Sequence, residues 1–231
     1  MLVQRLGISL PNIRPLGWNP ANEEANLIAW YQFLVGVTYD ASAPYGASQW
    51  RDSSGNDNHL NQGVALQQPA YAGNIGANKG DFTFTAASNQ FFNTTSQISL
   101  ADDFTIGFRA NPATYTGCIV GDVTSNGEFI RYKDSDTMRV SINNSSIDLD
   151  LSSGTWGDDA VVISRSSGTV SLYKNGTLQD SGTLANTADI DVVGIRKPTA
   201  NPYDGTLSEI QIYDTSNATL IANVSTRLKN L

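Results

Sequence analysis

The sequence predicts an all-β protein built as a two-sheet antiparallel sandwich. Short segments with alternating apolar and polar residues recur about every ten residues through most of the chain. Gly, Asn, Asp and Ser separate these segments, and the Asn175-Gly176 pair in particular favours a tight hairpin turn. Only the last residues of the chain show the spacing of an amphipathic helix. These patterns are typical of a sandwich or barrel and not of an α/β protein.

The strands are predicted in chain order from local patterns. Leu27–Leu34 is a short apolar run that suits a buried strand. Four phenylalanines flank a Ser/Asn turn and predict a hairpin, namely Phe82, Phe84, Phe91 and Phe92. Alternation predicts further strands around Phe104–Phe108, Phe129–Arg131, Met138–Ile142, Ile147–Leu151, Val161–Ile163, Val170–Leu172, Ile190–Ile195 and Leu207–Ile212. Three large aromatic residues are expected to anchor the core between the sheets: Trp30, Trp156 and Tyr213.

The two ends of the chain differ from the rest. Residues 1–24 contain three of the eight prolines, which fix φ and remove backbone donors, so we expect an extended, irregular arm. The arm is rich in apolar side chains, which favours docking on a partner over a disordered leader. Residues 25–231 form the predicted sandwich domain. At its end, helical spacing of Leu220, Ile221, Val224, Leu228 and Leu231 predicts a short helix capped by Ser216 or Asn217.

The composition of the chain argues against some classes of binding partner. The formal net charge of −8 disfavours nucleic acid, and no apolar run approaches the ~20 residues that span a bilayer. Pro11 and Arg14 interrupt the N-terminal apolar stretch, so no secretion signal is predicted. Cys118 is the single cysteine and His59 the single histidine, and we expect Cys118 to be a buried apolar side chain and not a nucleophile.

Several separated blocks resemble one known family. Ile28–Tyr31 is followed by Trp50-Arg51-Asp52-Ser53-Ser54-Gly55-Asn56, later by Asp103–Phe108, by Leu172–Gly176, and by Tyr203–Tyr213. In this order the blocks resemble the laminin-G-like, concanavalin A-like lectin/glucanase jelly-roll superfamily. The resemblance implies a jelly-roll sandwich over roughly residues 27 to 214 of the sequence, with hydrolases, calcium-binding modules and tailed-phage structural proteins among its members.

The sequence predicts no enzyme. Retaining glycosidases need two carboxyl groups about 5–5.5 Å apart. The pairs Asp189/Asp191 and Asp148/Asp150 have suitable spacing on a strand, but neither contains the glutamates that the hydrolases of the superfamily carry. We expect both pairs to lie on the wet face of a sheet.

Calcium is the one cofactor that the resemblance raises. Three polar loops offer oxygen ligands: Asp52–Asp57, Asp122–Glu128 and Lys133–Asp136. The competing interpretation of each loop is a turn in which short side chains satisfy backbone donors, and it is preferred for any single loop.

A sugar site would need exposed aromatic rings near amides. The candidates are Tyr45, Trp50, Tyr71, Tyr115 and Tyr203, with Asn74, Asn111 and Asn201. Most aromatic residues of a sandwich belong to its core, so no sugar site is assigned to them.

Two functions remain. The first is a non-enzymatic virion module, a phage capsid decoration or tail-fibre protein that the arm anchors to other virion proteins, located on the particle surface and oligomeric. The alternative is a carbohydrate-binding lectin that acts at a cell surface.

Overall fold

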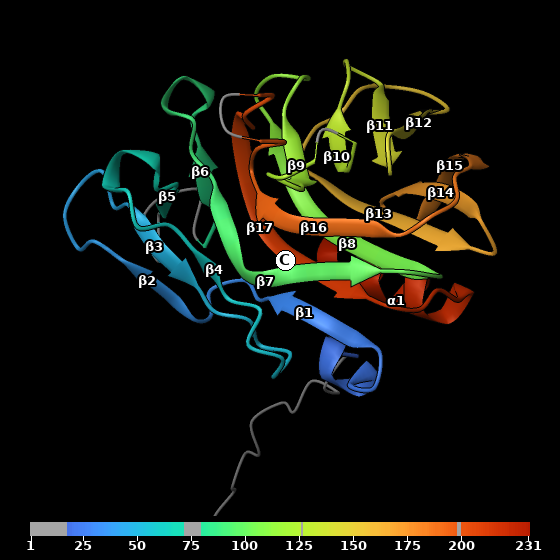
Figure 1. The fold of residues 1–231 in the computed structure, drawn as a ribbon, viewed down its shortest axis with the longest axis horizontal. Helices are drawn as coiled ribbons and strands as arrows, with labels where there is room; N and C mark the ends of the chain where they lie inside the picture. The colour runs from blue at the N-terminus through green and yellow to red at the C-terminus, as the bar shows by residue number, and fades with distance from the viewer. Residues whose placement is uncertain (1–17, 72–79, 126, 198–199) are drawn as a thin grey trace, which may run out of the picture.

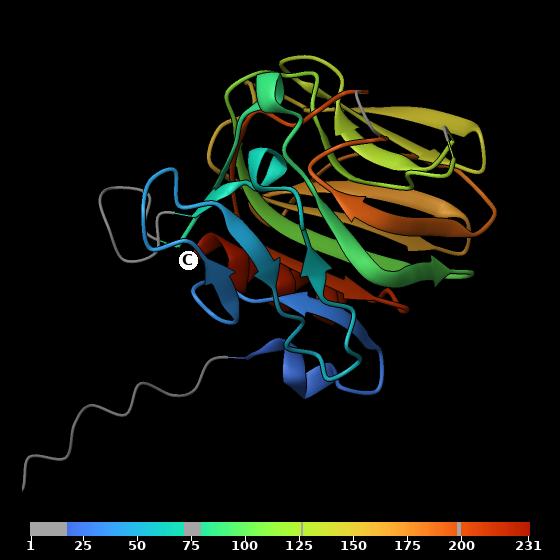
Figure 2. The ribbon, with the colours of Figure 1, turned by 60° about the vertical axis from the view of Figure 1, so that its left-hand side comes forward.

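The chain folds as two antiparallel β-sheets packed face to face, with one α-helix at the C-terminal end (Figures 1 and 2). This computed structural model describes residues 18–71, 80–125, 127–197 and 200–231. The predicted two-sheet sandwich with a short C-terminal helix is confirmed. Residues 1–17 of the predicted arm lie outside the described residues.

The first sheet has eight strands in the described residues, in the order β15-β14-β13-β8-β17-β6-β5, with β1 also paired to β17. These strands are β1 (Leu27–Tyr31), β5 (Ala70–Tyr71), β6 (Phe82–Phe84), β8 (Phe104–Pro112), β13 (Asp159–Ser166), β14 (Thr169–Lys174), β15 (Thr177–Thr183) and β17 (Gly205–Tyr213).

The second sheet has nine described strands, in the order β12-β11-β10-β9-β16-β7-β4-β3-β2. They are β2 (Val37–Tyr39), β3 (Ala47–Trp50), β4 (Leu60–Asn61), β7 (Phe92–Leu100), β9 (Cys118–Gly121), β10 (Phe129–Tyr132), β11 (Thr137–Ile142), β12 (Ser145–Asp150) and β16 (Ala188–Val193).

The main core lies between the sheets and is rich in aromatic rings. Phe82 of one sheet faces Phe92 of the other edge to face, with ring centroids 5.5 Å apart. Trp156 packs on Tyr132 in the same manner, with centroids 5.2 Å apart, as the sequence predicted for this tryptophan. Because every ring that leaves water stabilises the sandwich, the core needs no disulfide.

The predicted phenylalanine hairpin is wrong. β6 pairs with β5 and β17 in the eight-stranded sheet, whereas β7 pairs with β4 and β16 in the other sheet. The chain changes sheets at the 3-10 helix Ala86–Ser88. The phenylalanines therefore meet across the core and not within one hairpin, and a local pattern cannot distinguish these two arrangements.

Helix α1 (Ala218–Lys229) covers the outer face of the eight-stranded sheet (Figure 1). The Asn217 side chain accepts a hydrogen bond from the Leu220 amide, so the predicted cap is confirmed. Val224 and Leu228 lie so close to Gly107 of β8 that a Cβ there would be 2.3 Å from Val224 Cγ1. No helix in the described part of the chain is long and apolar enough to cross a membrane.

Two predicted anchors of the central core lie elsewhere. Trp30 and Tyr213 belong to a second apolar cluster, between the eight-stranded sheet and α1. Trp18 packs against the same cluster, and Pro20–Glu23 forms a 3-10 helix beside β1. The prediction of an extended conformation is therefore wrong for residues 20–23, where Pro20 favours the first turn of a helix.

Candidate functional site

The outer face of the nine-stranded sheet carries the candidate site. Ile130 and Tyr132 of β10 point into the core, so their neighbours Phe129 and Arg131 face outward. By the same alternation Asp189 and Asp191 of β16 face outward, since Ala188 and Ile190 are core residues. The sequence expectation of a wet strand face is met at these positions.

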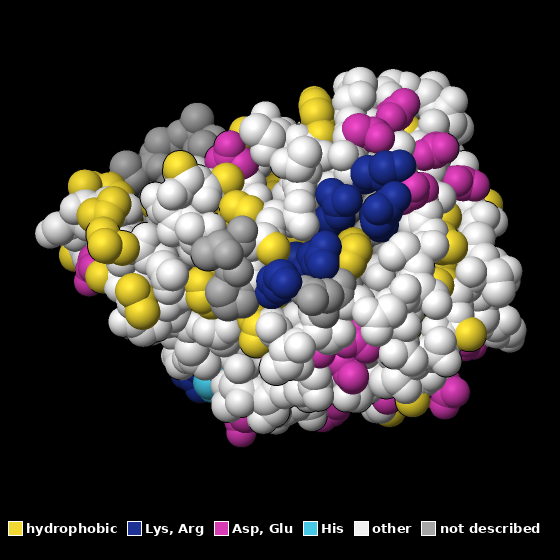
Figure 3. Space-filling view, turned by 45° about the horizontal axis from the view of Figure 1, so that its top comes forward, with side chains coloured by type: hydrophobic (Ala, Val, Ile, Leu, Met, Phe, Trp, Pro, Cys, Tyr) yellow, Lys and Arg dark blue, Asp and Glu magenta, His cyan; other side chains and the backbone are white. Residues whose placement is uncertain are grey.

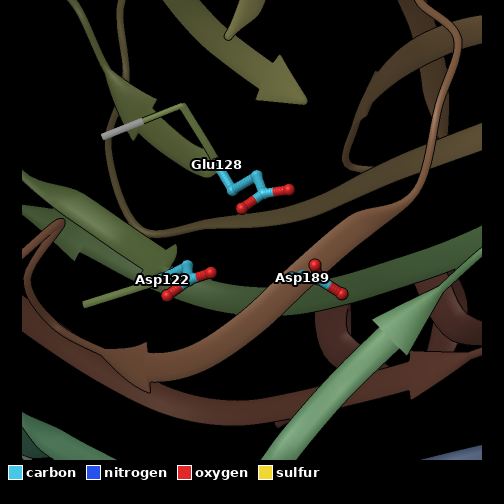
Figure 4. A group of neighbouring side chains, drawn as sticks. All are labelled: Asp122, Glu128 and Asp189. Atoms are coloured by element: carbon cyan, nitrogen blue, oxygen red, sulfur yellow. The ribbon is translucent and has the colours of Figure 1, made fainter. Parts of the chain in front are cut away.

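An acidic cluster lies on this face, formed by Asp122, Glu128 and Asp189 (Figure 4). Asp122 follows β9, Glu128 precedes β10, and Asp189 comes from the neighbouring strand β16. One carboxylate oxygen of each residue lies within 4.8 Å of the other two. The strand order β10-β9-β16 brings Asp189 beside Asp122 and Glu128, although it is distant from both in sequence.

Hydrogen bonds fix two of these carboxylates. Asp122 Oδ1 accepts from the amide and hydroxyl of Thr124, each at 2.7 Å, and Asp122 Oδ2 accepts from Gln97 Nε2 at 3.1 Å. The Ser99 hydroxyl donates to Asp189 Oδ1 at 2.5 Å. Within the described residues no Lys, Arg or His side chain forms an ion pair with the cluster. Its negative charges therefore repel one another without a protein cation.

The titration of the cluster reflects this crowding. Burial raises the pKa of Glu128 above its ordinary range, and Asp122 and Asp189 reinforce the effect. Burial also acts to raise the pKa of Asp122, but the hydrogen bonds from Thr124 and Ser125 outweigh it and leave this pKa below its ordinary range. Burial raises the pKa of the nearby Asp191 as well. A bound cation would favour the ionised form of every one of these groups.

The spacing of the acidic cluster matches part of the ligand set of a calcium ion. Calcium binds oxygen ligands at 2.3–2.6 Å, so two ligands of one ion lie no more than about 5 Å apart. The oxygens of Asp122, Glu128 and Asp189 satisfy this limit and would hold the ion, whose charge would remove their repulsion. The cluster does not suit glycoside hydrolysis, because Asp122 is only 2% exposed and Glu128 only 8% exposed. A sugar cannot reach these carboxyl groups.

A polar hollow of about 330 Å³ lies beside the acidic cluster. It is lined by Asn93, Thr94, Thr95, Ser96, Gln97, Thr124 and Asp191. Gln97 and Thr124 also hydrogen-bond Asp122, so the hollow and the cluster share side chains. Hydroxyl, amide and carboxylate groups of this kind both donate and accept hydrogen bonds, as sugar hydroxyl groups require.

The other two loops proposed for calcium are turns. Donors of the protein occupy the Asp52 carboxylate. It accepts hydrogen bonds from the amides of Trp30, Ser54 and Asn58 and from the Ser54 hydroxyl, at 2.7–3.1 Å. In the loop Lys133–Asp136, Asp134 accepts from the amides of Asp136 and Thr137. The competing interpretation holds for both loops.

Three of the five aromatic candidates for a sugar platform are buried and cannot contact a sugar. Trp50, Tyr71 and Tyr203 are buried in the core, as their size favours. Tyr45 and Tyr115 are half-buried, and Asn74 lies outside the described residues. Asn111 is exposed and Asn201 half-buried.

The other residues considered for catalysis have structural roles. Cys118 is buried, and burial raises the pKa of its thiol. His59 Nδ1 accepts a hydrogen bond from the Asp52 amide. Asp148 is bound by Arg139 and Lys133, and Asp150 accepts from the Thr137 hydroxyl, so this second acid pair is not free for catalysis.

Sequence reasoning treated the Asp122–Glu128 loop and the Asp189/Asp191 pair as separate features. The structure unites them, because β16 lies between β9 and β7. No local signal reveals this neighbourhood. The polar run Asn93–Gln97, which lines the hollow, gave no signal of its own because Ser, Thr and Asn are common throughout the chain.

Solved structures with the same fold include three carbohydrate-related or toxin domains. The binding domain of Paraclostridial Mosquitocidal Protein 1 superposes with a TM-score of 0.60 at 16% identity, covering 88% of this chain and 52% of that one. Domain 4 of AbnA, an arabinanase of Geobacillus stearothermophilus solved with arabinotriose, gives 0.58 at 17%, covering 87% and 98%.

The ligand-binding domain of botulinum neurotoxin serotype D, solved with N-acetylneuraminic acid, gives 0.61 at 14%, covering 90% of this chain and 53% of that one. The chain thus spans about half the length of the toxin domains and nearly all of the arabinanase domain. At these identities the likeness establishes the fold alone.

No curated protein sequence matches the chain. A family model does, and it confirms the resemblance drawn from the sequence blocks. The model describes the concanavalin A-like lectin/glucanases superfamily and matches residues 84–218, which is more than half of the chain. The chain belongs to the concanavalin A-like lectin/glucanases superfamily.

Proposed function

We propose that this chain is a non-enzymatic glycan-binding module, the second of the two functions derived from the sequence. The observation that carries the proposal is the polar hollow beside the acidic cluster, on the sheet face that no helix of the described residues covers. Its exposed hydroxyl and amide groups suit sugar hydroxyls, while the buried carboxyl groups beside it suit a cation. The glycan-related neighbours support this proposal.

A glycan array tests it, with the full chain applied in calcium and in chelator. The expected result is binding to a defined set of glycans without release of new reducing ends from them. Silence across the array would overturn the binding function, and consumption of a bound glycan would overturn its non-enzymatic character. Substituting Thr94→Ala together with Gln97→Ala should weaken binding about tenfold, because each lost hydrogen bond contributes about 0.5–1.5 kcal/mol.

The virion hypothesis remains a prediction, as do the virion location, the homo-oligomer and the docking of the arm. Trp18 packs on the domain and Pro20 is buried, so a deletion that tests the arm should end at residue 17. Loss of assembly into a particle or oligomer without loss of folding would support an arm that docks.

A further inference from the structure

A row of Lys and Arg side chains crosses the uncovered face of the nine-stranded sheet (Figure 3). We call it the basic stripe and define it by Lys133, Arg139, Arg131 and Arg196. Arg131 of β10 lies directly opposite Arg139 of β11. Arg131 and Arg196 both approach the Phe129 ring, with guanidinium carbons 5.8 and 4.8 Å from its centroid. Such a concentration of positive charge stands out in a chain of net charge −8.

Among the described residues, only two of the four cations of the basic stripe are paired with an acid. Asp148 binds Arg139 with two hydrogen bonds of 2.6 and 2.9 Å and Lys133 with one of 2.8 Å. Within the described residues Arg131 and Arg196 have no carboxylate within 4 Å. Their two charges are therefore not compensated.

The donors of these two arginines are also unsatisfied. Nε of Arg131 and Nε of Arg196 are buried and have no hydrogen-bond partner among the described residues. Within the described part of the chain, the Arg131 side chain makes a single hydrogen bond, from Nη1 to the Tyr132 carbonyl at 3.2 Å. Burial and the positive charges of Arg139 and Arg196 lower the pKa of Arg131. Unpaired buried donors and opposed like charges are both destabilising, so the fold alone does not explain this arrangement.

Other arginines of the chain show what a structural guanidinium looks like. Arg109 makes two hydrogen bonds to Asp158, at 2.8 and 2.6 Å, and a third to the Leu231 carbonyl. Arg165 donates to the carbonyls of Leu100, Asp102 and Asn186. In both arginines Nε, Nη1 and Nη2 all donate hydrogen bonds, whereas Nε of Arg131 and Nε of Arg196 do not among the described residues.

We infer that Arg131 and Arg196 form a binding site for an anionic group of an acidic glycan, a carboxylate or a sulfate. The inference rests on the proposed glycan-binding function and names its substrate class. A guanidinium presents its donors in a plane that matches a planar or tetrahedral oxyanion, and the Phe129 ring holds both guanidiniums in place. An oxyanion held between the two guanidiniums would relieve the repulsion between their charges.

A glycan is favoured over a nucleic acid by the surroundings of the basic stripe. Asp134 follows Lys133 directly, Asp136 lies two residues further on, and Asp148 is hydrogen-bonded to Arg139. Acidic side chains also border the row of cations in Figure 3. A chain of phosphates would be repelled by these carboxylates, whereas a single charged sugar needs only the uncompensated pair.

Isothermal titration calorimetry at low salt tests the site with four probes: lactose, 3′-sialyllactose, a heparin-derived hexasaccharide and a single-stranded DNA oligonucleotide. The sialylated probe carries a carboxylate alone and the heparin probe carries sulfates as well, so the two arms separate the sources of charge. We expect binding of at least one acidic glycan, weaker in high salt, and at least tenfold tighter than binding of lactose. The Nε–H signals of Arg131 and Arg196 should shift in NMR spectra on binding.

The double variant Arg131→Gln/Arg196→Gln should lose that binding at least tenfold while it remains folded. A matched control, Arg51→Gln/Lys229→Gln, removes the same charge from exposed positions elsewhere and should bind like the wild type. Loss in both variants would mean a non-specific charge effect and would overturn the site. Equal or tighter binding of the oligonucleotide would overturn the glycan assignment.

Failure of the inference and of the proposed function give different results. If only neutral glycans bind on the array, and the double variant binds them like the wild type, the module still binds glycans and the anionic site is wrong. If no glycan binds, both are wrong.

Discussion

The two outer faces of the sandwich use charge in opposite ways. On the covered face, Arg227 of α1 lies over the Trp30 ring, 5.0 Å from its centroid, and makes two hydrogen bonds to Glu209. Glu209 is fully buried and also accepts from Trp30 Nε1, Gln211 Nε2 and the Phe33 amide. On the open face, Arg196 lies equally close to the Phe129 ring but has no acid and leaves Nε unpaired within the described residues.

Charged side chains with a structural role can be distinguished here from those with a binding role by whether the protein itself supplies their partners. Where α1 covers the sheet, Arg227, Glu209 and Arg109 each have an opposite charge within the protein. Where the sheet is open, the acidic cluster and the two arginines Arg131 and Arg196 form no ion pair with any of the described residues. Proteins keep such unfavourable arrangements mainly at functional sites.

The largest effect is expected from breaking the sealed network. Glu209→Gln leaves the Arg227 cation without its carboxylate, and we expect a loss of about 3 kcal/mol in the free energy of unfolding. Denaturant unfolding measures it. Asp158→Asn breaks the more exposed pair with Arg109, whose acid side chain is 53% exposed, and should cost no more than about 1 kcal/mol. Equal losses in the two variants would contradict the structural role of the Glu209 network.

Gly107 tests the fit of α1 on the same face. Gly107→Ala places a methyl group against Val224, and we expect a loss of about 2 kcal/mol from overpacking. Gly63→Ala is the matched control, because nothing lies within 4 Å of a Cβ at that position. A melting temperature of Gly107→Ala equal to that of the control would mean that α1 is not held where the structure has it.

Local features of the fold were predictable from the sequence, and features set by strand order were not. Asn175-Gly176 has both residues at positive φ between β14 and β15, as the predicted turn requires. Asn217 caps α1 because the cap and the helix are adjacent in sequence. The acidic cluster depends on β16 lying beside β9, and the unpaired arginines depend on which acids lie near them. Such pairings are non-local, so no periodic pattern reveals them.

On the open face, the acidic cluster should respond to calcium and pH. Folding raises the pKa of Glu128, so its contribution to stability is complete below the ordinary glutamate pKa and is lost as pH rises through the folded-state value. We therefore expect calcium to stabilise the wild type near neutral pH. At a calcium concentration of a hundred times Kd, the free energy of unfolding should increase by about 2.7 kcal/mol, and the melting temperature should rise accordingly.

Glu128→Gln should melt higher than the wild type in chelator at neutral pH and gain less from calcium. Asp134→Asn, from a loop in which the acid only caps a turn, is the control and should keep the full calcium response. Identical melting of the wild type in calcium and in chelator would exclude the cation site.

The smallest effect is expected from the basic stripe. Because Arg131 and Arg196 have unpaired buried donors, Arg131→Gln/Arg196→Gln should change the free energy of unfolding by less than about 1 kcal/mol, or increase it. Denaturant unfolding in parallel with Glu209→Gln measures the contrast between the two faces. A loss as large as that of Glu209→Gln would show that these arginines are structural.

The most direct test of the contrast between the two faces is an NMR titration of the ¹⁵N-labelled full chain with calcium and then with a glycan selected on the array. We expect the shifted amide signals to belong to β7, β9, β10, β11 and β16 and to the loop that carries Asp122. The amide signals of α1, β13 and β14 should not shift. Shifts confined to α1 and the strands beneath it would contradict the assignment of binding to the open face.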